Sequence, residues 1–390
     1  MLRVLFAVLL VHASTPLWAA QPSPRAVDVT APDGAALKAT YYAAAGPGPA
    51  VLLLHMCNAT RESWDPVGRG LSAAGIHALA LDYRGYGDSP GDRHDTLPVA
   101  RRQALVTGAW PGDVDAALAH LQSQPGVDKS RAGAGGGSCG VQQAVHLARR
   151  QPAVRSLVLL AGGTDRAGLD FLHRTPWLPV FTAAAEDDQY DQQAPLLMQW
   201  LAELSGNPRN RFAGFADGRH GTEIFAPHPE LVQSIVDWFV DTLVKAPADP
   251  GTAVPLRTTP AIEFWSTMLA PGGVAKAVQL FHDARGRDPK VFLFPEGVMN
   301  QVAYERLQAG ETKDAVEIFK LIVEAYPTSA NAQDSLGDGY LAAGQNDLAL
   351  AASRRSLEML ATDRGNDQLK EAIRHSAQQK IDKLTADRKY

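Results

Sequence analysis

The sequence predicts an α/β domain with a mostly parallel sheet flanked by helices, followed by an all-helical segment. Three observations lead to this prediction. Short apolar runs alternate with amphipathic stretches from about residue 26 to residue 246, the pattern of strands joined by helices. A glycine-rich stretch at residues 133–140 stands between a strand candidate and a helix candidate. Beyond about residue 295 only helical patterns occur.

The composition is that of a globular protein that acts on small molecules. The chain has 390 residues, of which 45% are hydrophobic and 20% charged. Its length favours two domains. The net charge is −5 and no stretch is densely basic, which argues against nucleic acid as a partner.

The first twenty residues have the layout of a secretory signal peptide. Arg3 precedes an apolar run over residues 4–11, and Ala19 and Ala20 offer two cleavage points. The run is too short to span a bilayer, and no later segment is apolar enough, so we expect no membrane span in the mature protein. The expected location is secreted or periplasmic.

Each strand and helix of the predicted domain rests on its own local pattern. Polar and apolar residues alternate on both sides of Asp33-Gly34, which predicts an opening β-hairpin. The continuous run Ala50–His55 is typical of a strand buried on both faces. Further strands are expected in "IHALAL", "RSLVLLAGG", "LPVFTAAA" and "RFAGF", and helices in "WPGDVDAALAHLQ", "VQQAVHLARR" and "HPELVQSIVDWFVDTLVKA".

The pattern divides the chain after the signal peptide into three parts. Residues 21–247 form the α/β domain, and residues 248–294 form a Pro- and Thr-rich linker with one flanking helix. In residues 295–390, Gly310 matches Gly344 in two segments spaced by 34 residues. That period resembles tetratricopeptide repeats, which implies a protein or peptide partner, although the repeats could also only pack on the α/β domain.

The stretch "GAGGGSCG" satisfies two motifs at once. As G-x-G-x-x-G it would be a dinucleotide-binding loop, but the next strand then needs an acidic residue at its end, and this one ends in glycines. As G-x-S-x-G it is a nucleophile elbow, with Gly136 and Gly140 flanking Ser138. The plainer alternative for Ser138 is a helix N-cap.

Partners for a nucleophilic serine follow in the order Ser, Asp, His. Three acidic residues come directly after the strand candidate "PVFTAAA", and His220 stands in a glycine-flanked loop before the last helix of the domain. Both segments are expected at the carboxyl ends of the strands, where ligands bind in such sheets.

Residues 26–246 together resemble the α/β-hydrolase fold, particularly its dienelactone-hydrolase-like and acyl-esterase-like members. The resemblance implies Ser138 as nucleophile, His220 as general base and Asp188 as the acid that orients it, with Asp187 as the alternative. It implies no metal and no organic cofactor.

The resemblance also implies an oxyanion hole formed by the N–H of Cys139 and that of Cys57 or Met56. The chain departs from the family pattern at two places. The family has His-Gly where this chain has His55-Met56, and the expected strand "RAGAGGG" is poor in strand-forming residues. That segment is either squeezed between bulky neighbours or weakly ordered. The two cysteines are expected to lie close together, and we favour two unpaired thiols over a disulfide.

These features predict a serine hydrolase that cleaves carboxylic esters, or related acyl bonds, of small-molecule substrates through an acyl-serine intermediate. A peptidase of the same fold and a catalytically impaired binding or scaffold protein remain alternatives. Some fifteen residues separate "LVLLAGG" from "PVFTAAAEDD", which leaves no room for a lid domain, so an open site is expected.

Overall fold

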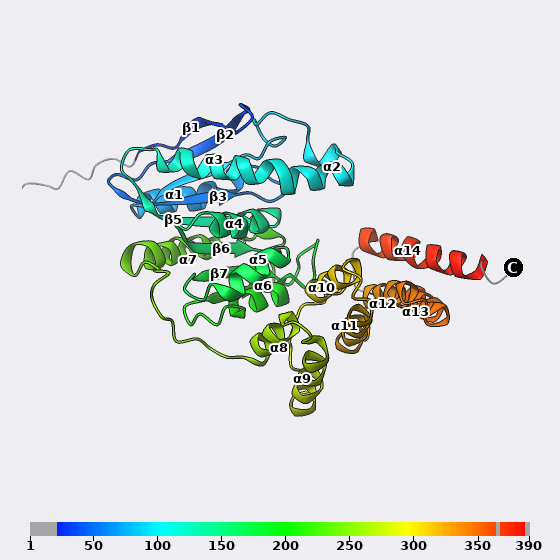
Figure 1. Cartoon of the computed structure of the whole chain (residues 1–390). Coiled ribbons are helices and arrows are strands. Elements are labelled where there is room, and N and C mark those ends of the chain that lie inside the picture. The colour runs from blue at the N-terminus through cyan, green and yellow to red at the C-terminus, as the bar shows by residue number, and fades with distance from the viewer. Residues whose placement is uncertain (1–21, 364–366, 387–390) are drawn as a thin grey trace, which may run out of the picture.

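The computed structural model describes residues 22–363 and 367–386 and places an eight-stranded sheet at the centre of the larger domain (Figure 1). The predicted signal peptide lies outside the described residues. The strands are β1 (Arg25–Thr30), β2 (Ala36–Tyr42), β3 (Gly48–Leu54), β4 (His77–Leu81), β5 (Val127–Gly137), β6 (Val154–Leu160), β7 (Val180–Ala185) and β8 (Arg211–Phe215).

The strand order is β1-β2-β4-β3-β5-β6-β7-β8. Strand β2 is antiparallel to both of its neighbours. The six strands of the sheet after β2, which are β4, β3, β5, β6, β7 and β8 in spatial order, are parallel to one another. The predicted opening hairpin is present, with Gly34 at φ +86° in its turn. This order, with one antiparallel strand near the first edge, is that of the α/β-hydrolase fold.

Helices cover both faces of the sheet, because alternate residues of each parallel strand point to opposite sides. In β3, Leu52 and Leu54 face the side covered by α3 to α6, whereas Leu53 faces α1 and α7. The helices and short helical turns of this domain are η1 (Arg61–Trp64), α1 (Asp65–Ala73), η2 (His94–Thr96), α2 (Val99–Ala104), η3 (Leu105–Ala109), α3 (Trp110–Gln122), α4 (Cys139–Arg150), α5 (Arg166–Arg174), α6 (Ala194–Glu203), η4 (Gly221–Phe225), α7 (Pro229–Phe239) and η5 (Val240–Lys245).

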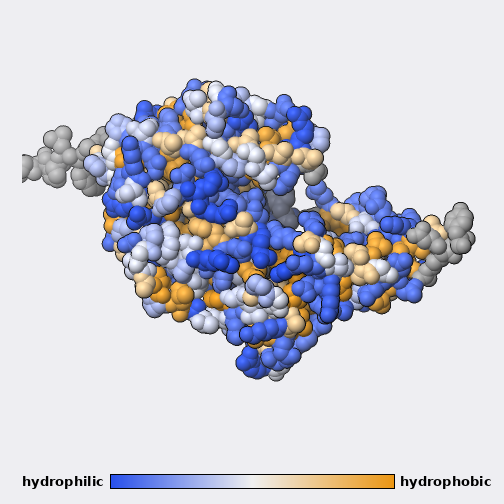
Figure 2. Space-filling model, viewed as in Figure 1, coloured by the Kyte–Doolittle hydropathy of each residue, from blue (hydrophilic) through white to orange (hydrophobic). Residues whose placement is uncertain are grey.

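The described residues after the α/β domain form an all-helical segment. Residues 248–294 contain two helices, where the sequence pattern indicated one. The helices are α8 (Pro260–Leu269), α9 (Val274–Arg287), α10 (Glu296–Gln308), α11 (Thr312–Ala325), α12 (Ala330–Ala342), α13 (Asn346–Met359) and α14 (Asp367–Ala386). The pairs α10–α11 and α12–α13 begin 34 residues apart, and each pair turns at a glycine with positive φ, Gly310 and Gly344. Figure 2 shows the surface hollowed where this segment meets the α/β domain.

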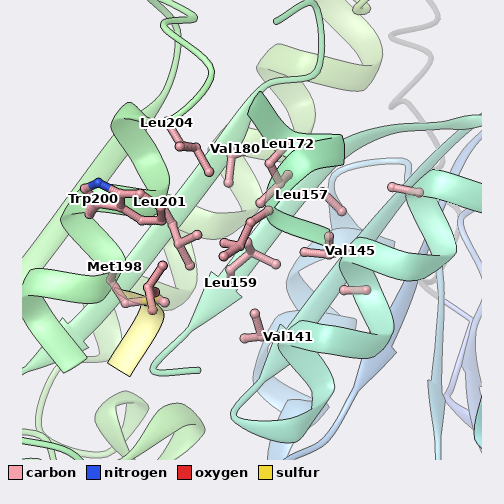
Figure 3. Packing of buried hydrophobic residues seen from close by; sticks show 14 of the residues in the cluster. Val141, Val145, Leu157, Leu159, Leu172, Val180, Met198, Trp200, Leu201 and Leu204 are labelled. Carbon is pink, nitrogen blue, oxygen red and sulfur yellow. The ribbon is translucent and has the colours of Figure 1, made fainter. Parts of the chain in front are cut away.

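The apolar core continues from the sheet into the helical segment. Leu157 and Leu159 of β6 pack between α4 and α6 (Figure 3). Farther out, Trp200 of α6 meets Trp265 of α8 with ring centroids 5.0 Å apart, and its indole N–H donates to the carbonyl of Leu293 at 3.1 Å. Because burial of such large aromatic side chains dominates core energetics, these contacts hold the helices against the α/β domain.

Strand β5 lies at the centre of the sheet although seven of its residues read "RAGAGGG". A Cβ at Gly133 would lie 2.6 Å from the ring of Phe239, and one at Gly135 would lie 3.0 Å from Leu53. The segment is therefore squeezed between bulky neighbours, and the glycines make room for them.

Candidate active site

Ser138 occupies the sharp turn between β5 and α4. Its backbone has φ +50° and ψ −118°, a conformation that a residue with a Cβ adopts rarely. Its N–H donates to the carbonyl of Leu160 at 2.9 Å, which ties the turn to β6. Ser138 holds the N-cap position of α4, but its side chain makes no capping hydrogen bond to the helix. The turn leaves the hydroxyl half-buried at the carboxyl end of the sheet.

Glycines around Ser138 allow backbones to approach closely. A Cβ at Gly136 would lie 2.2 Å from the carbonyl oxygen of Gly140, and a Cβ at Gly140 would lie 2.4 Å from that of Leu54. A Cβ at Gly162, after β6, would lie 2.3 Å from the carbonyl oxygen of Ser138. The two flanking glycines of the motif are thus required by contact between strand and helix, as a nucleophile elbow demands.

His220 and Asp188 form a buried pair. The distance from His220 Nδ1 to Asp188 Oδ2 is 2.7 Å, and the two residues are 6% and 2% exposed. The other oxygen of Asp188 accepts the N–H groups of Tyr190 at 2.9 Å and Asp191 at 3.0 Å. Three donors therefore hold this carboxylate, and the imidazole is oriented with Nε2 directed away from it.

Asp187 has a different position from Asp188. It is exposed, and its Oδ1 accepts the backbone N–H of Arg219 at 2.7 Å. Arg219 has φ +60°, so this hydrogen bond holds a strained residue directly before His220. The geometry brings Asp188, and not Asp187, to the imidazole.

The loop of His220 lies against the Ser138 turn. A Cβ at Gly137 would lie 3.6 Å from Cγ2 of Thr222, so the residue before Ser138 adjoins the residue two after His220. Met56 contacts both segments, because a Cβ at Gly221 would lie 2.8 Å from its sulfur and a Cβ at Gly137 would lie 3.9 Å from its Cβ. The structure thereby brings together the three segments in which the sequence placed serine, acid and histidine. Among the described residues the Ser138 hydroxyl has no hydrogen-bond partner, and such bonds often tighten only when substrate is present.

His55 sets the orientation of the loop after β3. Its Nε2 accepts the N–H of Tyr83 at 3.2 Å, so the proton resides on Nδ1, which donates to the carbonyl of Met56 at 2.7 Å. Burial lowers the pKa of His55 to about 4 and keeps the ring neutral. Because a trans peptide directs its C=O and N–H oppositely, the N–H of Cys57 points away from His55. Within the described part of the chain, the N–H groups of Cys57 and Cys139 have no acceptor.

Cys57 and Cys139 form a disulfide, with Cα atoms 5.8 Å apart. The expectation of two unpaired thiols is therefore wrong. Cys57 lies in the loop after β3, and Cys139 is the first residue of α4. The contact of Gly140 with the carbonyl oxygen of Leu54 brings these two elements together. The bridge links the two segments whose N–H groups lack acceptors.

Sequence reasoning missed two features beside the site. The Tyr190 ring lies edge-on to His220, with centroids 4.8 Å apart. Ala161 has φ +43°, directly before the glycine that contacts Ser138. The "AGG" after β6 and the aromatic residue two after Asp188 were the available signals. Within residues 22–363 and 367–386, no group of three His, Cys, Asp or Glu side chains could hold a metal ion, and no helix is long and apolar enough to cross a membrane.

Comparison with known proteins gives relatives for part of the chain. No family model matches it. Uncharacterized proteins from two strains of Mycobacterium tuberculosis are each 34% identical over 161 residues, which is 41% of this chain and 52% of the relative. The chain thus matches about half the length of these curated relatives.

Among solved structures, an esterase of Pyrococcus furiosus is 17% identical with a TM-score of 0.45, covering 57% of this chain and 91% of its own. A dienelactone hydrolase of Anabaena variabilis is 19% identical with a TM-score of 0.43, covering 57% and 99%. The strand order of the α/β domain is by itself that of the α/β-hydrolase fold.

Proposed function

We propose that this protein is a serine hydrolase that cleaves carboxylic esters of small molecules through an acyl-serine intermediate. The observation that carries the proposal is the buried Asp188–His220 pair, 2.7 Å apart, beside a strained serine at a strand-to-helix turn. Asp188 holds the proton on Nδ1 of His220, which leaves Nε2 free to accept the proton of the Ser138 hydroxyl.

The reaction then proceeds in two halves. Ser138 Oγ attacks the ester carbonyl while His220 takes its proton, and the imidazolium returns that proton to the departing alcohol. Water, activated by the same imidazole, hydrolyses the acyl-serine. The N–H groups of Cys139 and of Cys57 or Met56 stabilise the oxyanion, each contributing about 3 kcal/mol to the transition state by analogy with other hydrolases.

We also propose that the protein acts outside the cytoplasm. The Cys57–Cys139 disulfide supports this location, because such bonds persist in oxidising compartments.

Labelling with a fluorophosphonate tests the proposed function. Mass spectrometry of the adduct is expected to place it on Ser138, and the Ser138→Ala variant is expected to remain unlabelled and inactive on p-nitrophenyl acetate and butyrate. Wild-type protein that is folded but neither labelled nor active would contradict the proposal and favour a binding protein. Cleavage of peptides but not esters would instead favour the peptidase.

A further inference from the structure

A cavity of about 900 Å³ lies between the α/β domain and the helical segment. From the first domain it is lined by Gly163 and by residues 189–193, and from the second by residues 295–298 and by Asn331. Figure 2 shows a hollow in the surface between the α/β domain and the helical segment. Its volume suits a drug-sized ligand.

The cavity adjoins the proposed catalytic residues. Gly163 follows the glycine that contacts Ser138, and Gln189 and Tyr190 follow Asp188. The Tyr190 ring, which lies against His220, is part of the cavity wall. A substrate whose carbonyl lies at Ser138 therefore has this cavity as a neighbouring space, bounded on its far side by α10 and α12.

Glu296, the first residue of α10, is the unusual side chain in the wall. It is 5% exposed and accepts hydrogen bonds on Oε1 from Ser329 Oγ at 2.8 Å and Asn331 Nδ2 at 2.9 Å. Its Oε2 has only a long contact of 3.4 Å from Gln193 Nε2. Among the described residues, no Lys, Arg or His lies within salt-bridge distance of it. Buried carboxylates are ordinarily paired with a cation, so this one lacks a counter-charge.

The rest of the wall adds acidic and aromatic side chains. Asp191 and Asp363 add two carboxylates, and the described lining residues include no Lys, Arg or His. Tyr190 and Tyr326 add aromatic side chains to the lining, and the face of an aromatic ring attracts cations. Because Oε1 of Glu296 already has two donors, one oxygen remains for the ligand. That suits the point charge of an ammonium group better than the two-pronged guanidinium.

We infer that this cavity binds an alkylammonium group of the substrate, with Glu296 as its counter-charge. The inference rests on the proposed function and adds the substrate class: esters whose acyl or alcohol part carries a primary amine. The helical segment then supplies specificity, and the α/β domain supplies the chemistry.

Matched esters test the inference. The p-nitrophenyl esters of 6-aminohexanoate and 8-aminooctanoate are compared with heptanoate and nonanoate, in which a methyl replaces the ammonium. Wild type is expected to favour each ammonium ester in kcat/KM by about tenfold, through a lower KM, the effect of one charge-assisted hydrogen bond. The ratio is expected to fall towards one in Glu296→Gln and to decrease in Asp191→Asn, a change that keeps the backbone N–H donated to Asp188. Glu317→Gln, the same change on α11 outside the cavity, is expected to keep the ratio.

A binding measurement separates this inference from the proposed function. Calorimetric titration of hexylammonium into Ser138→Ala protein is expected to show binding that weakens about tenfold with the added Glu296→Gln change. Ester turnover without any preference for the ammonium substrates, together with hexylammonium binding that ignores Glu296, would overturn the inference and leave the hydrolase intact. Glu296-dependent binding without turnover of any ester would instead overturn the hydrolase and support the cavity.

Discussion

The Cys57–Cys139 disulfide is expected to stabilise the folded protein strongly. It joins residues 82 positions apart, so it closes a long loop that the unfolded chain would otherwise leave open. In the chain-entropy treatment, a loop of that length corresponds to about 4.5 kcal/mol of free energy of unfolding at 25 °C. Reduction with dithiothreitol should therefore lower the urea midpoint markedly.

Thiol–disulfide exchange measures this quantity without assuming two-state unfolding. The fraction of bridged protein is determined in defined mixtures of oxidised and reduced dithiothreitol, once in buffer and once in concentrated guanidinium. Folding and disulfide formation are linked equilibria. The free energy by which the disulfide stabilises the folded state therefore equals the free energy by which folding promotes formation of the disulfide. About 4.5 kcal/mol corresponds to an effective thiol concentration about three orders of magnitude higher in the folded state than in the unfolded state.

The Cys57→Ala/Cys139→Ala variant is the control, and its urea midpoint is expected to be insensitive to dithiothreitol. A ratio of effective concentrations below about ten would refute the reasoning. It would mean either that the folded protein does not hold the two Cα atoms near 5.8 Å or that the unfolded chain keeps them together.

Three further predictions concern the site and its support. Asp188→Asn is expected to lower kcat for short esters by about four orders of magnitude, because an amide no longer holds the proton of His220 on Nδ1. Asp187→Asn should retain most activity, and comparable losses in both variants would contradict the assignment of the acid. Gly140→Ala is expected to lower the thermal midpoint, because its Cβ would lie 2.4 Å from a carbonyl oxygen of β3. Gly286→Ala, in α9, is the control: a Cβ there has no neighbour within 4 Å, and the change should raise the free energy of unfolding by about 0.5–1 kcal/mol. The pKa of His55 is about 4 in the folded state and 6.5 ordinarily, so between pH 6.5 and pH 4 only the unfolded state binds a proton at this ring. The free energy of unfolding should therefore fall by about 3 kcal/mol as the pH decreases from 6.5 to 4. Urea midpoints across that range check this, and the slope should flatten in His55→Asn.

Local patterns of the sequence determined most of the α/β domain and predicted the type of its site. Alternation around Asp33-Gly34 predicted the hairpin, and the continuous apolar run from Ala50 predicted a strand buried on both faces. The turn at Ser138 was also readable, because Gly136 is required by the local backbone, where a Cβ would lie 2.2 Å from the carbonyl oxygen of Gly140. Gly140 in addition makes room for the carbonyl of Leu54 in β3, a contact between distant segments. The order of the serine, the acidic cluster and the histidine after successive strands predicted them as the candidate catalytic residues.

Tertiary structure decided what depends on distances between elements. The choice of Asp188 over Asp187 follows from the direction in which the loop after β7 turns, and the cysteine pair follows from the contact of α4 with β3. The hairpin period of 34 residues gave no indication that Glu296 would be buried beside the active-site loops without a cation. The sequence alone predicted which residues would perform the chemistry. Packing of the helical segment against α6 and the loop after β7 decided what surrounds them, because contacts between distant segments leave no periodic trace in a single sequence.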